Sequence, residues 1–316
     1  MARTVKGHQA AANAHVPLPT RDGVAPSYLW LTESRAGGML RFLAERFPDV
    51  SPDAWAARLA RGEIVDARGA PLAADSHVRQ GMRIWYYREL EAPETPIPFE
   101  EKVLFRDAHL LVADKPHFLP TIPTGRFLKE TLLVRLKRAH DLPHLVPIHR
   151  LDRETAGVVI FSHNPDTRGA YQSMFQKRVV RKTYEALAPA LEGRAFPFTY
   201  RSRMQDGAEQ FFVSEEVAGE PNSETLIELV ERRGALARYR LHPHTGRKHQ
   251  LRLHLSSLGA PILNDAFYPV AQPVRDDDFK APLQLLARSI AFDDPLTGQA
   301  RSFSSELRLA WPTRSP

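Results

Sequence analysis

The chain has 316 residues, of which 43% are hydrophobic and 25% are charged, a balance typical of a soluble globular protein. It contains no cysteine, which excludes disulfide frameworks, thiolate nucleophiles, iron–sulfur clusters and cysteine-ligated zinc. The net charge of +6 favours polyanionic partners only slightly, because many proteins are mildly basic without binding one.

The N-terminal third is expected to hold a leader and a small module. Residues 1–27 have no apolar core of the signal-peptide type, and no stretch of the chain reaches the ~20 apolar residues that a membrane span needs. We therefore expect a disordered leader, no membrane association and a cytoplasmic protein. Residues 28–90 are expected to form a compact unit with two helices, over GGMLRFLAERF and SPDAWAARLARG, a strand and a turn in EIVDARGAPL, and another strand in MRIWYYREL. Ser51 suits the N-cap of the second helix, and Pro52 suits its first position.

A proline-rich segment separates this unit from the rest of the chain. Residues 91–98, EAPETPIP, contain three prolines and predict an extended linker. Residues 99–316 are expected to form one large α+β domain. Its predicted strands lie in HLLVADKP, VVRKTYEALAP, ALARYRLHPH and LQLLARSIAF, and its helices in LKETLLVRLKRAH, HNPDTRGAYQSMFQKR and GRKHQLRLHLSSLG. Since helices do not alternate regularly with strands, a doubly wound parallel sheet is disfavoured.

The first segment that could carry chemistry is PIHRLDRETAGVVIF, residues 147–161, in which a loop leads into a run that is built to be buried. Asp152 stands there between Arg150 and Arg153. A carboxylate between two arginines is expected to have a lowered pKa and to be ionised at neutral pH. It could act as a nucleophile or stabilise a cation at a sugar carbon. A structural ion pair is the alternative interpretation.

The second segment is the basic strand KRVVRKTYEAL. Lys177, Arg178, Arg181 and Lys182 surround a strand that ends at Tyr184. Basic residues next to an aromatic ring are typical of a phosphate track with a platform for base stacking. A solvated basic edge strand, with the tyrosine packed in the core, would give the same pattern.

The third segment, HPHTGRKHQLRLHLSSLG, begins as a turn and continues as a helix. Arg247, Lys248 and Arg252 lie near the start of that helix, where free backbone N–H groups can bind an anion. The alternative is a basic amphipathic helix whose leucines belong to the core.

Cofactor and metal motifs are missing from the sequence. It has no Walker loop, no G-x-S-x-G, no H-E-x-x-H and no glycine-rich dinucleotide motif. Four histidines cluster in sequence but lack Asp or Glu partners at a recognisable spacing, which disfavours a metal site: His242, His244, His249 and His254. We therefore expect neither a metal nor an organic cofactor.

Taken together, HRLDRETAG, RKTYEAL and GRKHQLRLH…LGAPILNDAFY resemble, in this order, the RNA pseudouridine synthases of the RluA-like family. The resemblance covers about residues 99–311. The N-terminal unit is similar to a divergent S4-type RNA-binding module through ARLARGEIVDARG…VRQGMRIWYY. The resemblance implies an α+β fold with a mixed, largely antiparallel sheet and flanking helices, plus a small α/β S4-like domain.

The resemblance also implies roles for individual residues. Asp152 would be the catalytic aspartate, and Arg252 would pair with it and hold its carboxylate. Tyr184 would stack on the target uracil and serve in proton transfer, and Arg150 would help to displace the target base from the RNA. The remaining RNA-binding residues would be Arg153, Lys177, Arg178, Arg181, Lys182, Arg247 and Lys248. The chain departs from frequent family residues at Ala156, Leu286 and Asp294, which concerns the subgroup and substrate.

The implied reaction breaks the N1–C1′ bond of uridine, turns the base and rejoins it through C5. It needs an ionised carboxylate, a stacking surface and a basic surface for the RNA backbone, but no electron carrier. The expected partner is ribosomal or transfer RNA, and the expected state is a monomer. Two alternatives remain open: an RNA glycosidase or hydrolase that uses the same carboxylate, and a catalytically silent RNA-binding protein.

Overall fold

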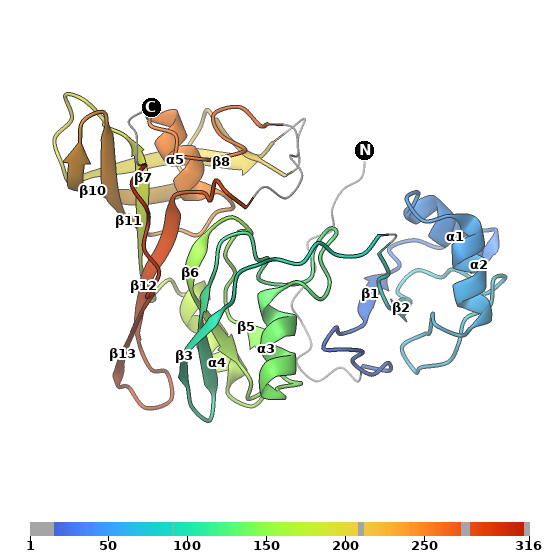
Figure 1. Ribbon diagram of the computed structural model, residues 1–316. Coiled ribbons are helices and arrows are strands. Elements are labelled where there is room, and N and C mark those ends of the chain that lie inside the picture. Colours follow the sequence, from blue (N-terminus) through green and yellow to red (C-terminus); the bar gives the residue numbers. More distant parts are fainter. Residues whose placement is uncertain (1–15, 91, 208–211, 273–278, 313–316) are drawn as a thin grey trace. The chain divides into compact units, whose positions relative to one another are not determined.

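The computed structural model describes residues 16–90, 92–207, 212–272 and 279–312 (Figure 1). The chain forms two compact units, residues 1–93 and 94–316. Within the described ranges, no helix is both long and apolar enough to cross a membrane.

The boundary between the units falls inside the proline-rich segment. The carboxylate of Glu94 accepts hydrogen bonds from the backbone N–H groups of residues 128–130, at distances near 2.8 Å. Ile97 is buried in a core cluster of the second unit. The linker is therefore shorter than predicted, because residues from 94 onward are packed against the large domain; residue 91 lies outside the described residues.

The N-terminal unit consists of β1 (Ser27–Trp30), α1 (Gly38–Arg46), α2 (Pro52–Ala60) and β2 (Arg83–Tyr86). Both predicted helices are confirmed, and the Ser51 hydroxyl accepts a hydrogen bond from the N–H of Ala54, as expected of an N-cap. A core of Met39, Leu43, Trp55, Ile64 and Ile84 joins the helices to the two strands.

Two expectations for this unit need correction. The segment EIVDARGAPL forms only isolated bridges of Val65, because Asp66 accepts hydrogen bonds from the N–H groups two and four residues later and turns the chain. The expected leader is also too long. The hydroxyl of Tyr87 donates to the carbonyl of Pro19 at 2.6 Å, and the Arg21 guanidinium lies 3.8 Å from the centre of the Tyr87 ring. Residues 1–15 lie outside the described residues.

The second unit holds the remaining elements in an α+β arrangement, and every strand and helix predicted between 99 and 316 is confirmed. Its elements are β3 (Lys102–Arg106), β4 (Leu110–Lys115), α3 (Leu132–His140), β5 (Val146–Pro147), β6 (Ala156–Ser162), α4 (Arg168–Gln176), β7 (Arg181–Pro189), β8 (Phe198–Asp206), β9 (Ser214–Val217), β10 (Ser223–Arg233), β11 (Leu236–Pro243), α5 (Gln250–Ser257), β12 (Leu285–Asp293) and β13 (Ala300–Ser304).

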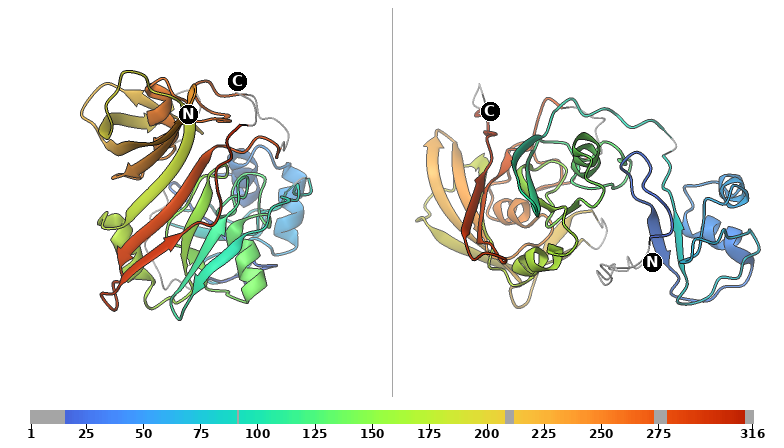
Figure 2. Two further views of the ribbon diagram at one scale, coloured as in Figure 1. Left: turned by 60° about the vertical axis from the view of Figure 1, so that its left-hand side comes forward. Right: turned by 90° about the horizontal axis from the view of Figure 1, so that it is seen from below.

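These strands form one mixed sheet in the order β3-β4-β6-β12-β7-β11-β10-β8-β9, with β13 paired to β12 and β5 paired to β6. The pairing of β6 with β12 is parallel, and the other pairings of this sheet within the described ranges are antiparallel. Figure 2 shows β7 and β12 as long neighbouring arrows through the middle of the unit. The sheet confirms the mixed, largely antiparallel architecture that the resemblance implies.

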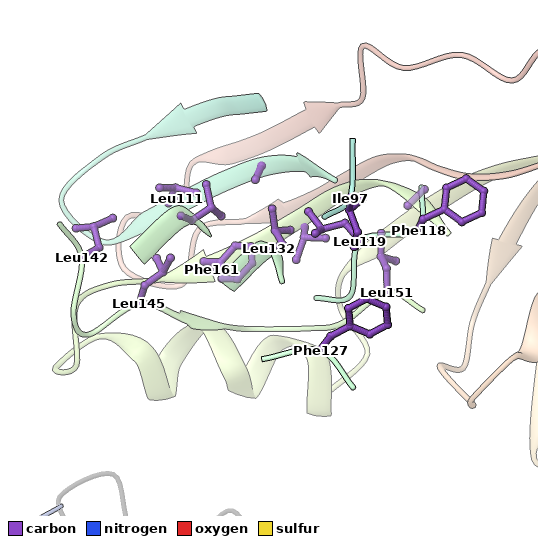
Figure 3. Packing of buried hydrophobic residues seen from close by; sticks show 14 residues of the cluster. Ile97, Leu111, Phe118, Leu119, Phe127, Leu132, Leu142, Leu145, Leu151 and Phe161 are labelled. Atoms are coloured by element: carbon purple, nitrogen blue, oxygen red, sulfur yellow. The ribbon is translucent and has the colours of Figure 1, made fainter. Parts of the chain in front are cut away.

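The main core of this unit lies between α3 and the strands β4 and β6. Leu111 of β4, Leu132 of α3 and Phe161 of β6 are fully buried there, together with Leu119 from the segment that follows β4 (Figure 3). Burying each of these side chains contributes roughly 1.5–3 kcal/mol. The core therefore fixes the positions of the segments that leave β4 and enter β6.

A glycine marks the closest backbone approach in the sheet. Gly157 has φ of +117° and pairs with Ala287 of β12, and a Cβ atom placed on it would lie 2.2 Å from the Ala287 carbonyl oxygen. The same register row continues to Lys115 of β4 on one side and Tyr184 of β7 on the other. Only glycine lets β6 and β12 pair at this point, which sets the spacing between the β6 loop and Tyr184.

Candidate active site

A cleft of about 870 Å³ opens over the middle of the sheet, a volume that suits a nucleotide-sized ligand. It is lined by the loop before β6, the start of β7 and the turn before α5. The only acidic side chain among the described residues that line it is Asp152, and seven basic side chains surround it: Arg150, Arg153, Arg178, Lys182, Arg247, Lys248 and Arg252.

The loop that carries Asp152 is fixed by side chains from the segment after β4. The Thr121 hydroxyl donates to the carbonyl of Leu151 at 2.8 Å and accepts from its N–H at 3.2 Å. The His117 ring lies 2.8 Å from the carbonyl oxygen of Glu154. The N–H of Thr155 closes a turn onto the carbonyl of Asp152 at 3.2 Å. These contacts hold the backbone on both sides of the carboxylate.

Lys115 supports the same loop from beneath. Its side chain is fully buried, and its ammonium donates to the carbonyls of Pro116, Leu119 and Arg153 at 3.1, 2.7 and 3.0 Å. Burial lowers the pKa of Lys115 to about 7, although the charges of Glu154 and Asp152 oppose the shift. One buried lysine thus joins the end of β4 to the loop that carries Asp152.

Arg252 is 1% exposed and is held mainly by Asp265. Its Nε and Nη2 donate to the two carboxylate oxygens of Asp265 at 2.8 and 2.6 Å, a bidentate arrangement. Its Nη1 lies 3.7 Å from carboxylate oxygens of both Asp152 and Glu154. Burial alone would lower the pKa of Arg252, but Asp265 raises it overall, so the guanidinium stays charged beside Asp152.

The expected lowered pKa of Asp152 is wrong. Burial in the cleft wall raises the pKa of Asp152, and this effect exceeds the opposing charges of Arg252 and Lys115. The Nε of the flanking Arg153 donates to the carbonyl of Phe118, and Asp152 forms an ion pair with Arg252, which is distant in the chain. The carboxylate side chain still keeps 33% of its surface open to the cleft.

Tyr184 lies on β7 with its side chain half-buried between the two largest core clusters of the unit, and it lines the cleft. Burial, and then the charge of Asp152, raises the pKa of Tyr184, so the phenol stays protonated at neutral pH. Strand β7 runs between β12 and β11. The alternative of a basic edge strand is therefore wrong.

His249 caps α5 in a conformation that is uncommon for a side chain other than glycine, with φ of 54°. Its ring stacks on Phe267, hydrogen-bonds to the Tyr268 hydroxyl at 3.2 Å and places Nε2 3.9 Å from Asp152. Burial lowers the pKa of His249 to about 3, so the ring is neutral. Such backbone strain is concentrated at functional sites.

Most of the predicted site residues meet in the cleft. Nine of the eleven line it, and the exceptions are Lys177 and Arg181. Arg181 and Lys182 project to opposite faces of β7, which explains why Lys182 shares the cleft with Tyr184 and Arg181 does not. Arg153 makes its contacts within the protein. Its Nε donates to the Phe118 carbonyl, and its guanidinium lies 4.9 Å from the centre of the Phe127 ring.

The histidines that cluster in the sequence make separate contacts in the structure. In the described ranges, no group of three histidine, aspartate or glutamate side chains is placed to hold a metal ion. His254 points into the protein, where its ring contacts the hydroxyls of Ser223 and Thr225 at 2.9 and 3.0 Å. The three departures from frequent family residues, Ala156, Leu286 and Asp294, do not line the cleft.

Four side chains that support the site were not assigned a role from the sequence: Asp265, Lys115, His117 and Thr121. Each of them contacts a residue of the site that is distant from it in the chain. Asp265 lies inside the segment LGAPILNDAFY. The sequence feature that could have indicated its role is an acid shortly after a helix that carries a buried arginine. Lys115 lies next to a proline at the end of a buried strand, where a lysine is unusual.

Sequence comparison with known proteins points to one family. The family model for RNA pseudouridylate synthase matches residues 109–257. The dual-specificity RNA pseudouridine synthase RluA of Salmonella typhi is 30% identical over 207 residues, covering 64% of this chain and 90% of the relative. The tRNA pseudouridine(31) synthase of Saccharomyces cerevisiae is 32% identical over 209 residues, covering 58% of this chain and 50% of the relative.

A solved structure extends the likeness to the fold. The human RNA pseudouridylate synthase domain containing 1 protein superposes with a TM-score of 0.55 at 21% identity, covering 67% of this chain and 86% of that chain. The sequence match to the RluA protein covers most of that relative, and the family model includes the loop, the basic strand and the helix that line the cleft. The chain therefore belongs to the RNA pseudouridine synthases and is an RluA-like enzyme that isomerises uridine in RNA to pseudouridine.

Proposed function

We propose that the cleft isomerises uridines of ribosomal or transfer RNA with Asp152 as its catalytic carboxylate. The observation that carries this assignment is that Asp152 is the single acid among the described residues that line the cleft, where seven basic side chains surround it. Basic side chains neutralise RNA phosphates, so the acid is the one group there that repels the ligand and needs another purpose. The name of the yeast relative supports transfer RNA as one target class. The monomeric state and the cytoplasmic location stay predictions.

Asp152 would act next to the glycosidic bond of a uridine that has been turned out of the RNA. A carboxylate whose pKa is raised is a stronger base and nucleophile, once ionised, than one neutralised by close ion pairs. Arg252 stays at 3.7 Å because Asp265 takes its two shorter hydrogen bonds. The arginine would thus orient Asp152 and stabilise its charge without blocking its reactive oxygen.

Tyr184 would hold the detached uracil. Its ring lines the cleft from the register row that also contains Gly157, so the strand pairing fixes its place relative to the catalytic loop. Because the phenol remains protonated, its hydroxyl can donate a hydrogen bond or a proton to the base. Among the described residues, that hydroxyl has no hydrogen-bond partner, which leaves it available to substrate.

The N-terminal unit would supply RNA affinity and substrate choice as an S4-like module. Five arginines lie on or between the elements of the S4-like pattern, and not all of them remain candidates for RNA contact: Arg58, Arg61, Arg68, Arg79 and Arg83. Arg58 is buried and donates to the carbonyl of Tyr87, and Arg61 pairs with Glu63 at 2.8 Å. Arg68, Arg79 and Arg83 make no ion pair with a described residue.

The test is the substitution Asp152→Asn, which keeps the shape and removes the charge. Pseudouridine mapping of target RNA should show loss of isomerisation, while the RNA dissociation constant stays within a few-fold of wild type because phosphate contacts carry most affinity. Product analysis separates the alternatives: a same-mass isomer supports the proposal, a released base supports a glycosidase, and unchanged RNA with wild-type enzyme supports a silent binder. Residual turnover near wild type would remove Asp152 from the reaction.

A further inference from the structure

The two strands of the N-terminal unit expose an unusual face. Strands β1 and β2 form an antiparallel pair (Figure 1). In this pair, Tyr28 lies opposite Trp85 and Trp30 lies opposite Arg83. Because side chains alternate along a strand, these four project to one side. The residues between them, including Leu29 and Ile84, pack with the core of α1 and α2. We name the side formed by Tyr28, Trp30, Arg83 and Trp85 the aromatic face.

The aromatic face is solvent-accessible. Tyr28 and Trp30 are 45% and 49% exposed, whereas Trp85 beneath them is buried. The rings of Tyr28 and Trp85 are 5.1 Å apart, and the Arg83 guanidinium lies 4.2 Å from the centre of the Trp30 ring. Large exposed rings add to the apolar surface in contact with water, and adjacent exposed rings of this kind mark binding surfaces.

The Arg83 guanidinium has aromatic rings rather than an acid as its neighbours. Arg35 pairs with Glu33 and Glu45, and Arg41 pairs with Glu45. The guanidinium of Arg83 makes no hydrogen bond or ion pair with any residue that the structure describes, and its Nε is buried without an acceptor. Its charge is instead held among the rings of the aromatic face. A guanidinium in this state can pair with an anion from a ligand.

A second cation extends the face along β2. Tyr87 follows Arg83 and Trp85 in the same alternation, and its ring is covered by the Arg21 guanidinium at 3.8 Å. Two arginines therefore flank the exposed rings at opposite ends of the strand pair. Alternation of planar rings with cations matches the alternation of bases with phosphates in an unpaired nucleic-acid strand.

We propose that the aromatic face binds unpaired nucleotides of the RNA substrate, with bases stacked on Trp30 and Tyr28 and a phosphate paired with Arg83. The proposal rests on the RNA-binding role given to the N-terminal unit above, and it assigns that role to one surface and one ligand chemistry. A paired RNA helix keeps its bases stacked inside, so the face selects single-stranded segments that flank the target.

The test uses the full chain and the variant Trp30→Ala. The probe is a cytidine oligomer of about 12 nucleotides, which lacks uridine, and the comparison ligand is a fully paired duplex of equal length. Trp30→Ala should weaken oligomer binding roughly 10-fold and leave duplex binding unchanged. The salt slope should stay the same, because no charge is removed. Trp30→Phe keeps a ring and should restore most of the affinity.

Arg83→Gln and Arg61→Gln form a matched pair, since each removes one arginine from the same unit, but Arg61 lies off the aromatic face and pairs with Glu63. Arg83→Gln should weaken oligomer binding and lower the salt slope by ~0.7, the value for one phosphate contact on a single strand. Arg61→Gln should leave the oligomer affinity within about two-fold of wild type. Equal effects of the two substitutions would mean that binding follows overall charge, and would overturn the proposal.

Two further results would overturn it. Wild-type affinity of Trp30→Ala for the oligomer would show that the face does not stack bases. A lower unfolding temperature or a changed molar mass for this variant would show that the face packs against protein. Pseudouridine formation by the wild-type enzyme is a separate measurement, so failure of the catalytic proposal and failure of this one are distinguishable.

Discussion

Arg252 in the cleft and Arg83 on the aromatic face both lie against aromatic rings, at 4.8 Å from Phe267 and 4.2 Å from Trp30. Arg252 is fully buried and fixed by Asp265, whereas Arg83 pairs with no acid of the described residues and lies beside exposed rings. We infer that an arginine fixed by one acid can orient a second acid for chemistry. An arginine whose guanidinium lies only against aromatic rings can use its charge to bind an anionic ligand.

The largest effect is expected from removing the acid that fixes Arg252. Asp265→Asn removes the charge that compensates Arg252 and leaves a buried cation poorly paired, which typically costs about 3–5 kcal/mol. We expect the free energy of unfolding in urea to fall by that order and pseudouridine formation to be lost. The matched control is Glu63→Gln, which breaks the exposed pair with Arg61 and should cost no more than about 1 kcal/mol. Equal losses in both variants would contradict the special status of the Arg252 pair.

The second-largest effect is expected at Tyr184, whose ring lines the cleft. Tyr184→Phe keeps the stacking surface and removes the hydroxyl, so RNA affinity should remain while turnover falls by roughly 10²–10⁴-fold, the range for lost acid–base assistance. Tyr184→Ala should reduce both. Single-turnover rates and filter binding measure the two properties separately. Similar behaviour of the two variants in both assays would show that stacking and proton transfer are not divided as proposed.

The third effect concerns the support of the catalytic loop. The pKa of Lys115 is lowered to about 7 in the folded protein, below its unfolded value, so the unfolded chain binds more protons between about pH 7 and the unfolded value near 10.4. Stability from this group therefore rises with pH in that window, by at most ~1.4 kcal/mol per pH unit. Urea unfolding at pH 7, 8 and 9 should show a steeper rise for wild type than for Lys115→Met. Parallel pH dependences would mean that the lysine is not forced towards its neutral form.

The smallest effect comes from removing the N-terminal unit. A chain that begins at Glu94 should stay folded by circular dichroism, since Glu94 and Ile97 complete the second unit. It should bind RNA more weakly, with a salt slope reduced by ~0.7–0.9 for each lost phosphate contact. A chain that begins at Phe99 lacks both residues and should be less stable. An unchanged slope in the folded chain from Glu94 would deny the N-terminal unit an RNA role.

The sequence predicted the parts of the site that are contiguous. The loop with Asp152, the strand with Tyr184 and the helix with Arg252 were each recognisable in short segments, and the structure brings all three to one cleft. The elements around them followed from runs of buried residues, as for β4 and β6. Strand β10 was missed because its outer half is exposed and charged, which hides the alternation that marks a strand.

The electrostatics of the site were not predictable from the sequence. The lowered pKa expected for Asp152 rested on its neighbours in the chain, but burial and residues more than thirty positions away decide the shift. Lys115 reaches the loop from β4, and Arg252 and Asp265 reach it from beyond β11. Neighbours along a loop point in different directions, so adjacency in sequence does not establish an ion pair.

The contact between Gly157 and Ala287 has a consequence for how freely this enzyme can change. Any side chain at Gly157 would push β6 away from β12, and with it the catalytic loop away from Tyr184. The position lies outside the cleft, so a search for new RNA targets that varies only cleft residues leaves it untouched. The residues that line the cleft can therefore change while the pairing of β6 with β12 still requires glycine at position 157.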